Sequence, residues 1–173
     1  MDKLGVVIDT NCIKVFIHDE ELDIPSSLWE LIDTIMRKCG LAINKIIEYE
    51  WRQRTSNHYK YWFEENYKKG YIYCPKLNQK LSAKERNTLI QKHGFPNSRD
   101  IHYIQVAINT QLKYILTQDM HFYEPKMKLA SGAEKDRIRE KRTGGVCRYL
   151  KKELEITVGM PDHCRIELKN CCQ

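Results

Sequence analysis

The feature that most constrains this chain is a short apolar run that ends in a carboxylate. Val6, Val7 and Ile8 are β-branched, which favours a strand buried on both faces. Asp9 follows directly, where burial of an unpaired charge would be costly. The carboxyl ends of parallel strands are where open α/β sheets hold their ligands. We therefore expect Asp9 to belong to a site at the edge of a sheet, together with other acids of the chain.

Apolar runs of this kind recur and alternate with segments of helical periodicity. We expect strands at residues 4–9, 41–43, 114–117 and 155–158, and the alternation of polar and apolar residues also fits a short extra strand at 165–168. We expect helices at 28–39, from 45 to about 69 with a kink near 56–57, from Ser82 to Gly94, from Ser98 to about Leu112 and at 146–153, and a loop at 71–81. This order predicts the α/β class, with a three-layer α/β/α fold, a mainly parallel central sheet and a single domain over residues 1–173.

The positive charge of the chain is concentrated in one segment. Ten basic and three acidic residues lie between Lys126 and Lys152, whereas the formal net charge of the whole chain is +6. We interpret residues 124–145 as a basic insert that binds a polyanion, with RNA contacts from Lys126, Lys128, Arg137, Arg139, Lys141 and Arg142. A solvated charged segment without a partner is the alternative, and residues 130–143 fit either a polar helix or disordered chain. The aromatics and lysines of 59–69 would also suit RNA, but a helix that packs its aromatic face on the core explains them more simply.

Several classes of protein are disfavoured by what the sequence lacks. No window approaches the roughly 18 consecutive apolar residues of a membrane helix, and residues 1–5 lack the basic and apolar regions of a signal peptide. A soluble, cytoplasmic protein with no membrane contact is therefore expected. The seven cysteines are irregularly spaced without a C-x-x-C pair, which argues against a disulfide framework or a zinc module. The sequence also lacks a phosphate-binding glycine loop and a nucleophile elbow.

Three further carboxylates stand where a fold does not require them. Glu50 lies on the apolar face of its expected helix, at helical spacing from two isoleucines. Asp100 begins a helix that is apolar almost all round, although a lone acid in a first turn can simply complement the helix dipole. Asp119 repeats the pattern of Asp9, because it comes just after the apolar run at 114–116.

These acids can converge on one edge of a parallel sheet. Four carboxylates a few ångströms apart repel one another and cannot all ionise without cations. Hard oxygen ligands in such an arrangement suit Mg²⁺ or Mn²⁺, which polarise a phosphoryl oxygen and generate hydroxide from bound water. The sequence therefore predicts a divalent-metal site built from Asp9, Glu50, Asp100 and Asp119.

In order and spacing, four segments resemble the motifs of PIN-domain ribonucleases over about residues 1–123. They are Val7 to Asn11, Ile43 through Glu50 and Trp51, Asp100 with Ile104 and Ala107, and Leu116 to Asp119 with Phe122. The resemblance implies a metal-dependent endoribonuclease that cuts RNA by attack of water on the phosphodiester, with the four acids as metal ligands or as groups that position the water. It also implies that Asn11 and Thr117 support the site, and it is compatible with a homodimer and with a protein inhibitor or antitoxin.

Other readings compete with this hypothesis. The long insert at 56–97 and the basic segment at 124–145 depart from the compact toxins of that family, so an RNA-processing or defence role fits as well. A PIN-like scaffold that binds RNA without cutting it would also use the basic segment, but the presence of all four acids argues against it. A haloacid-dehalogenase-type phosphatase places Asp after its first strand, but it needs a second Asp where this chain has Asn11. The six histidines show no metal-ligand spacing, and only His121 is a candidate substrate contact.

Overall fold

A parallel sheet forms the centre of the protein. The computed structural model describes residues 3–13, 26–53, 57–96, 100–127 and 130–169. Within them, five strands pair in the order β3-β2-β1-β4-β5, namely β1 (Val6–Ile8), β2 (Leu41–Ala42), β3 (Ile72–Tyr73), β4 (Tyr114–Leu116) and β5 (Thr157–Gly159). Every pairing is parallel, and Val6, Val7 and Ile8 lie opposite Tyr114, Ile115 and Leu116. The predicted fold class is confirmed.

The order in which strands are added to the sheet reverses direction at β1, which is the central strand. From β1 the chain moves outward through β2 to β3, and then returns to the other side of β1 to add β4 and β5. The connections that leave β1 and β4 therefore run in opposite directions and open a crevice between the carboxyl ends of these two strands. Asp9 follows β1 and Asp119 follows β4, so both acids are delivered to this crevice.

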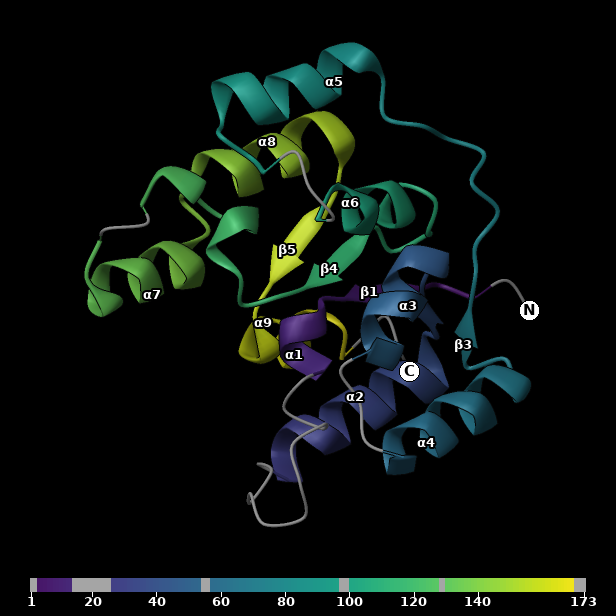
Figure 1. Cartoon of the computed structure of the whole chain (residues 1–173). Helices are drawn as coiled ribbons and strands as arrows, with labels where there is room; N and C mark the ends of the chain where they lie inside the picture. Colours follow the sequence, from purple (N-terminus) through teal and green to yellow (C-terminus); the bar gives the residue numbers. More distant parts are fainter. Residues whose placement is uncertain (1–2, 14–25, 54–56, 97–99, 128–129, 170–173) are drawn as a thin grey trace.

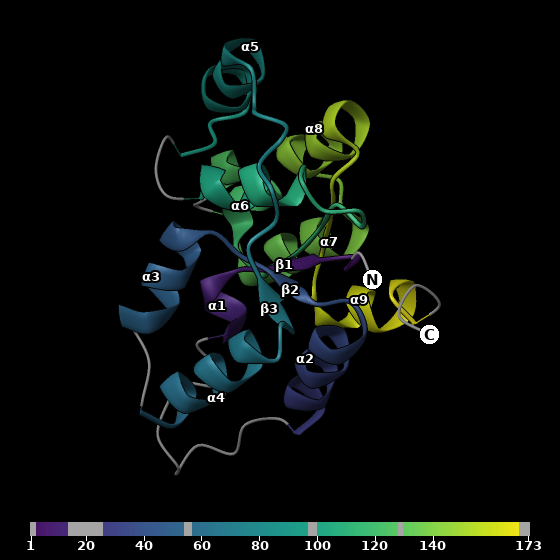
Figure 2. The same ribbon diagram turned by 90° about the vertical axis from the view of Figure 1, so that its right-hand side faces the viewer.

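Helices cover both faces of the sheet. Figure 2 shows α6 and α8 over one face and α2 and α9 over the other. The helices are α1 (Thr10–Ile13), α2 (Ser26–Lys38), α3 (Lys45–Gln53), α4 (Asn57–Lys68), α5 (Ala83–Asn87), the π-helix η2 (Thr88–Lys92), α6 (Ile101–Ala107), the short 3₁₀ helices η3 (Met120–Phe122) and η4 (Pro125–Met127), α7 (Gly132–Lys141), α8 (Gly145–Leu154) and α9 (Pro161–Glu167). Helix α7 stands apart from the sheet at the left of Figure 1.

Local sequence signals explain where several helices begin and end. Asn44 Oδ1 accepts hydrogen bonds from the Ile46 and Ile47 amides at 3.1 and 2.9 Å and so caps α3. Ser82 and Glu85 form the predicted capping box at the start of α5. Gly40 follows α2 with φ +81°, a conformation in which glycine carries no Cβ penalty. The observed bounds of α2, of α5 with η2 and of α8 confirm the predicted helices at 28–39, 82–94 and 146–153 to within a few residues.

Three expectations need correction. Residues 71–81 are not all loop, because Ile72 and Tyr73 pair with β2 as β3. Residues 165–168 are not a strand: they belong to α9 and its end, where Pro161 occupies the first turn and fixes a helical φ. Helix α6 ends at Ala107 rather than near Leu112, and its Ser98 cap lies outside the described residues. The helix expected at 45–69 with a kink near 56–57 corresponds to α3 and α4, and residues 54–56 between them lie outside the described residues.

The core surrounds β1 and β4. The apolar side chains of these central strands are completely buried, as expected for strands covered on both faces; they are Val6, Val7, Ile8, Ile115 and Leu116.

In the described part of the chain, no helix is both long and apolar enough to cross a bilayer. Four of the described cysteines are free thiols: Cys12, Cys74, Cys147 and Cys164. Cys39 is disulfide-bonded, and the spacing of the cysteines in the sequence did not predict this bond.

Candidate metal centre

Asp9 is a buried carboxylate at the centre of the crevice. Its side chain is 5% exposed, and Asp9 Oδ2 accepts a hydrogen bond of 2.7 Å from the Thr117 hydroxyl. Burial raises the pKa of Asp9 to about 6, hydrogen bonds from Thr117 and the Asn11 backbone oppose the rise, and the charges of Asp119 and Asp100 add to it. Asp9 therefore lies close enough to Asp119 and Asp100 for their negative charges to raise its pKa.

Asp119 is fixed on the other side of the crevice by the turn that follows β4. It is the N-cap of η3: Asp119 Oδ1 accepts from the His121 amide at 2.9 Å, and the Asp119 amide donates to Thr117 Oγ1 at 2.9 Å. Asn11 Nδ2 donates to Asp119 Oδ2 at 3.3 Å. Thr117 and Asn11 thus each contact both strand-end acids, Asn11 through its backbone to Asp9 and through its side chain to Asp119, which places both of these predicted supporting residues within the site.

Asp100 and His121 complete a compact group of potential metal ligands with Asp119. His121 Nδ1 lies 3.1 Å from Asp100 Oδ2 and 3.4 Å from Asp119 Oδ1. One ligand atom from each of Asp100, Asp119 and His121 lies within 4.8 Å of the others. Burial raises the pKa of Asp100, the hydrogen bond with His121 lowers it, and the charges of Asp119 and Glu50 raise it further.

Glu50 reaches the site through hydrogen bonds rather than as a member of that group. Glu50 Oε2 accepts from the Tyr103 hydroxyl at 2.9 Å and from Thr10 Oγ1 at 3.4 Å. Thr10 and Tyr103 are hydrogen-bonded to each other through their hydroxyls, and the Thr10 amide also donates to Tyr103 Oη at 3.3 Å. Since Thr10 directly follows Asp9, this network fixes Glu50 next to the start of α1.

The side chains of the site match the chemistry of a hard or borderline divalent cation. Carboxylates supply most of the donor atoms, as Mg²⁺ and Mn²⁺ prefer. Burial and, secondarily, repulsion between the acids raise the pKa values of Asp9 and Asp100, and a nearby cation would offset both effects. The nitrogen of His121 suits Mn²⁺ or another transition metal better than Mg²⁺. Asp100, Asp119 and His121 are therefore the residues whose ligand atoms lie close enough together to hold such an ion, and Asp9 lies beside this group without belonging to it.

A cleft of about 660 Å³ opens beside the strand-end acids. Asn11, Asp119 and His121 line one side, and Lys135 and Arg139 of α7 line another. Arg139 Nη1 pairs with Asp136 at 2.9 Å, whereas Lys135 forms no ion pair within the described ranges. The cleft thus combines a carboxylate group with cations that a polyanion could contact.

The other predicted RNA-binding residues are dispersed. Arg137 and Lys141 are exposed on α7, and Lys128 lies outside the described residues. Lys126 Nζ donates to the Lys92 carbonyl at 2.7 Å, beside η2. Arg142 Nη1 is paired with Glu167 at 2.6 Å and lines a different cavity. Of these candidates, Arg139 is the one that lines the cleft next to Asp119.

The helix with interleaved aromatics and lysines packs on the core. In α4, Tyr59 and Phe63 are buried while Lys60 and Lys68 are exposed. Trp51 of α3 meets Phe63 edge to face, with ring centroids 6.2 Å apart. This arrangement is the simpler of the two explanations that the sequence allowed.

Three residues of the site were not predicted as metal-site residues. Thr10 adjoins Asp9, and Tyr103 follows Asp100 by one helical turn. Their positions relative to these two acids could therefore have indicated from the sequence that both belong to the site. His121 was expected at most to contact substrate, because its spacing from the acids matches no metal-binding motif. Its proximity to Asp100 arises only when α6 packs beside η3.

Comparisons with known proteins do not identify a family. The chain gave no match to a protein-family model, to a curated protein or to a solved structure.

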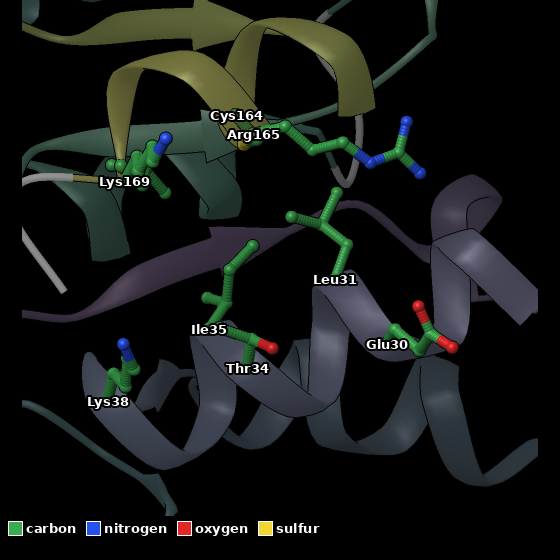
Figure 3. Close-up of a pocket in the computed structure, with 9 residues that line it drawn as sticks. Glu30, Leu31, Thr34, Ile35, Lys38, Cys164, Arg165 and Lys169 are labelled. Atoms are coloured by element: carbon green, nitrogen blue, oxygen red, sulfur yellow. The ribbon is translucent and has the colours of Figure 1, made fainter. Parts of the chain in front are cut away.

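A further cavity, of about 300 Å³, lies between α2 and α9 and is lined by apolar side chains with Glu30, Lys38, Arg165 and Lys169 around it (Figure 3). It contains a single carboxylate, so the crevice beside Asp9 is the better candidate for a metal centre.

Proposed function

We propose that the protein is a Mg²⁺- or Mn²⁺-dependent ribonuclease. The observation that carries the proposal is the compact group of Asp100, Asp119 and His121 at the switch point of a parallel sheet, with the buried carboxylate of Asp9 beside it. Ligand binding is the common use of this position in open α/β sheets, and a carboxylate cluster there suits a metal that acts on phosphate esters. The likeness of the four acidic motifs to those of PIN-domain ribonucleases adds the substrate class, RNA.

Some residues of the site bind the metal ion, and others hold the metal-binding side chains in position. Asp100, Asp119 and His121, joined by Asp9, hold the ion, and a bound ion would polarise a phosphoryl oxygen and lower the pKa of water. Thr117 orients Asp9 by hydrogen bonding, and Asn11 orients Asp119. Glu50, held by Tyr103 and Thr10, is placed to accept a proton or to position water rather than to complete the most compact ligand group.

The cations of α7 contribute to substrate binding. Lys135 and Arg139 line the same cleft as Asp119, and Arg137 and Lys141 are exposed farther along the helix. Phosphates of a single strand that enters the cleft pass between these cations and the acids. Binding through phosphates gives affinity that falls steeply with salt.

The experiment is a cleavage assay on protein freed of metal with a chelator. Labelled single-stranded RNA, hairpin RNA and single-stranded DNA are incubated with Mg²⁺, with Mn²⁺ or without metal. Cleavage of RNA is expected only with metal, and Asp9→Asn or Asp119→Asn is expected to reduce the rate by about 100-fold or more, as removal of a catalytic group commonly does.

Glu48 and Glu50 provide a matched pair. Both lie on α3, but Glu48 pairs with Arg52 at 3.0 Å on the surface. Glu50→Gln is expected to lose activity and Glu48→Gln to retain it. Metal-independent cleavage, or equal activity in the two variants, would refute the assignment. RNA binding by the wild type without cleavage of any substrate would favour the non-catalytic scaffold instead.

A further inference from the structure

A second charged cavity lies at the opposite end of β4 from Asp119. It has a volume of about 440 Å³ and is lined by the beginnings of β4 and β5, by α8 and by the end of α9. Its lining contains three cations, Arg142, Arg148 and Lys151, but one carboxylate, Glu167. The cavity shares no residue with the cleft beside the metal centre.

The single carboxylate of this cavity is already engaged. Glu167 Oε1 accepts from Arg142 Nη1 at 2.6 Å, and Glu167 Oε2 accepts from the Tyr114 hydroxyl at 2.8 Å. Burial raises the pKa of Glu167, but the hydrogen bonds from Arg142 and Tyr114 outweigh burial and hold it below the ordinary value. An ionised Glu167 offsets one of the three positive charges and leaves an excess of two.

The other two cations have no acidic partner in the described part of the chain. Arg148 is exposed and forms no ion pair there. Lys151 Nζ donates to the neutral Thr157 hydroxyl at 2.9 Å, while the nearby acid Glu155 pairs with Lys113 at 2.6 Å. Arg148 and Lys151 are three positions apart on α8, so they lie on the same face of the helix.

Arg142 retains unused hydrogen-bonding capacity. Its Nε and Nη2 atoms are buried and have no hydrogen-bond partner. Unsatisfied N–H groups of a guanidinium are costly, so an anion in the cavity would favour a turn of the side chain toward it. The cavity also has an apolar wall, to which Leu112, Val158 and Leu168 contribute.

We propose that this cavity binds a phosphomonoester of a small organic molecule, such as a nucleoside 5′-monophosphate. The phosphate group contacts Arg148 and Lys151, with Arg142 as a third donor, and its two negative charges match the excess of two positive charges. The organic part packs on the apolar wall. The inference does not rest on the ribonuclease proposal, because none of the acids of the metal centre takes part.

Calorimetric titration of the full chain in a chelating buffer tests this site. The probes are uridine 5′-monophosphate, inorganic phosphate, uridine and an oligouridylate with a 5′-hydroxyl end. We expect saturable binding of the monophosphate and none of uridine. The variant with both Arg148→Ala and Lys151→Ala is expected to bind about tenfold more weakly or worse, because two charge-assisted contacts are lost.

Two controls separate this site from general charge effects and from the metal centre. Lys152→Ala removes one positive charge from the neighbouring position of α8, where the side chain is 85% exposed, and is expected to leave affinity unchanged, whereas Lys151→Ala alone, which removes the same charge, is expected to weaken binding. Asp119→Asn is also expected to bind normally. Absence of saturable binding, equal affinity in the double variant, or binding of the 5′-hydroxyl oligouridylate but not the monophosphate would overturn the proposal.

Discussion

Replacement of Asp9 by Asn should stabilise the metal-free protein. Burial and two neighbouring acids raise the pKa of Asp9 from its ordinary value of 3.8 to about 6, so the folded state disfavours the ionised carboxylate. Asn is neutral and similar in shape, and its amide oxygen can still accept the hydrogen bond that Thr117 donates to Asp9. The substitution therefore removes the cost of the charge and keeps the neighbouring contacts.

The magnitude and the pH range follow from the pKa shift. A shift of roughly two units corresponds to about 3 kcal/mol of unfolding free energy, at 1.36 kcal/mol per unit. Because the pKa is raised in the folded state, the stability that protonated Asp9 contributes is fully present below pH 3.8 and is lost as the pH rises through about 6. Asp9→Asn should therefore exceed the wild type by up to about 3 kcal/mol at pH 7, with the difference shrinking toward pH 4.

Urea denaturation between pH 4 and 7.5, with and without metal, measures this difference. A divalent cation bound by Asp9 should reverse the order of stability, since a ligand at 1,000 times its Kd adds about 4.1 kcal/mol to the wild type alone, which exceeds the advantage of the variant. Asp33→Asn is the control: Asp33 pairs with Arg37 at 2.7 Å on the surface of α2, so its loss should change stability by less than about 1 kcal/mol.

The reasoning fails if Asp9→Asn is less stable than the wild type at pH 7 in chelator. It also fails if the difference between the two proteins stays constant from pH 7 to pH 4. Equal stabilisation of wild type and variant by Mn²⁺ would show that Asp9 does not take part in metal binding.

Three further outcomes can be measured. Tyr103→Phe removes the hydroxyl that bonds Glu50 and Thr10 and should cost about 1–2 kcal/mol in chemical denaturation, whereas no loss would show that the network is dispensable. Gly144→Ala would place a Cβ 2.1 Å from the Tyr123 carbonyl oxygen, so a loss of about 1–3 kcal/mol in thermal or urea unfolding is expected. Combined Lys135→Ala and Arg139→Ala should reduce the slope of log affinity for single-stranded RNA against log salt by about 1.4, and an unchanged slope would place the RNA elsewhere.

Where the fold could be predicted, the signal was local. The apolar run before Asp9, the capping box at Ser82 and the Gly40 terminus each involve residues within one or two turns of chain, so the sequence contains the whole interaction. The strand β3 was missed because its two residues become a strand only by pairing with β2. The segment at 165–168 alternates like a strand, but Pro161 and the packing of α9 beside β5 make it helical.

In the candidate site, too, the features that depend on local sequence were predictable and those that depend on distant contacts were not. Asp9 and Asp119 were predictable because each follows a buried apolar run, and the positions of both are fixed by the strands before them. Which of the acids approach most closely was not predictable, since Glu50 meets Tyr103 and Thr10 while Asp100 meets His121. The shift of Arg142 away from the cleft likewise follows from its ion pair with Glu167, 25 positions farther along the chain.

The sequence by itself determined that the chain folds around short parallel strands and that two of them end in carboxylates, because periodicity and residue type control burial over a few residues. Only the tertiary structure decided that Asp100, Asp119 and His121 come within 4.8 Å of one another, and that Arg139 rather than Arg142 lines the cleft beside them. These placements depend on how α6, η3 and α7 pack, and contacts between residues distant in sequence follow from the shape of the whole core rather than from any local pattern.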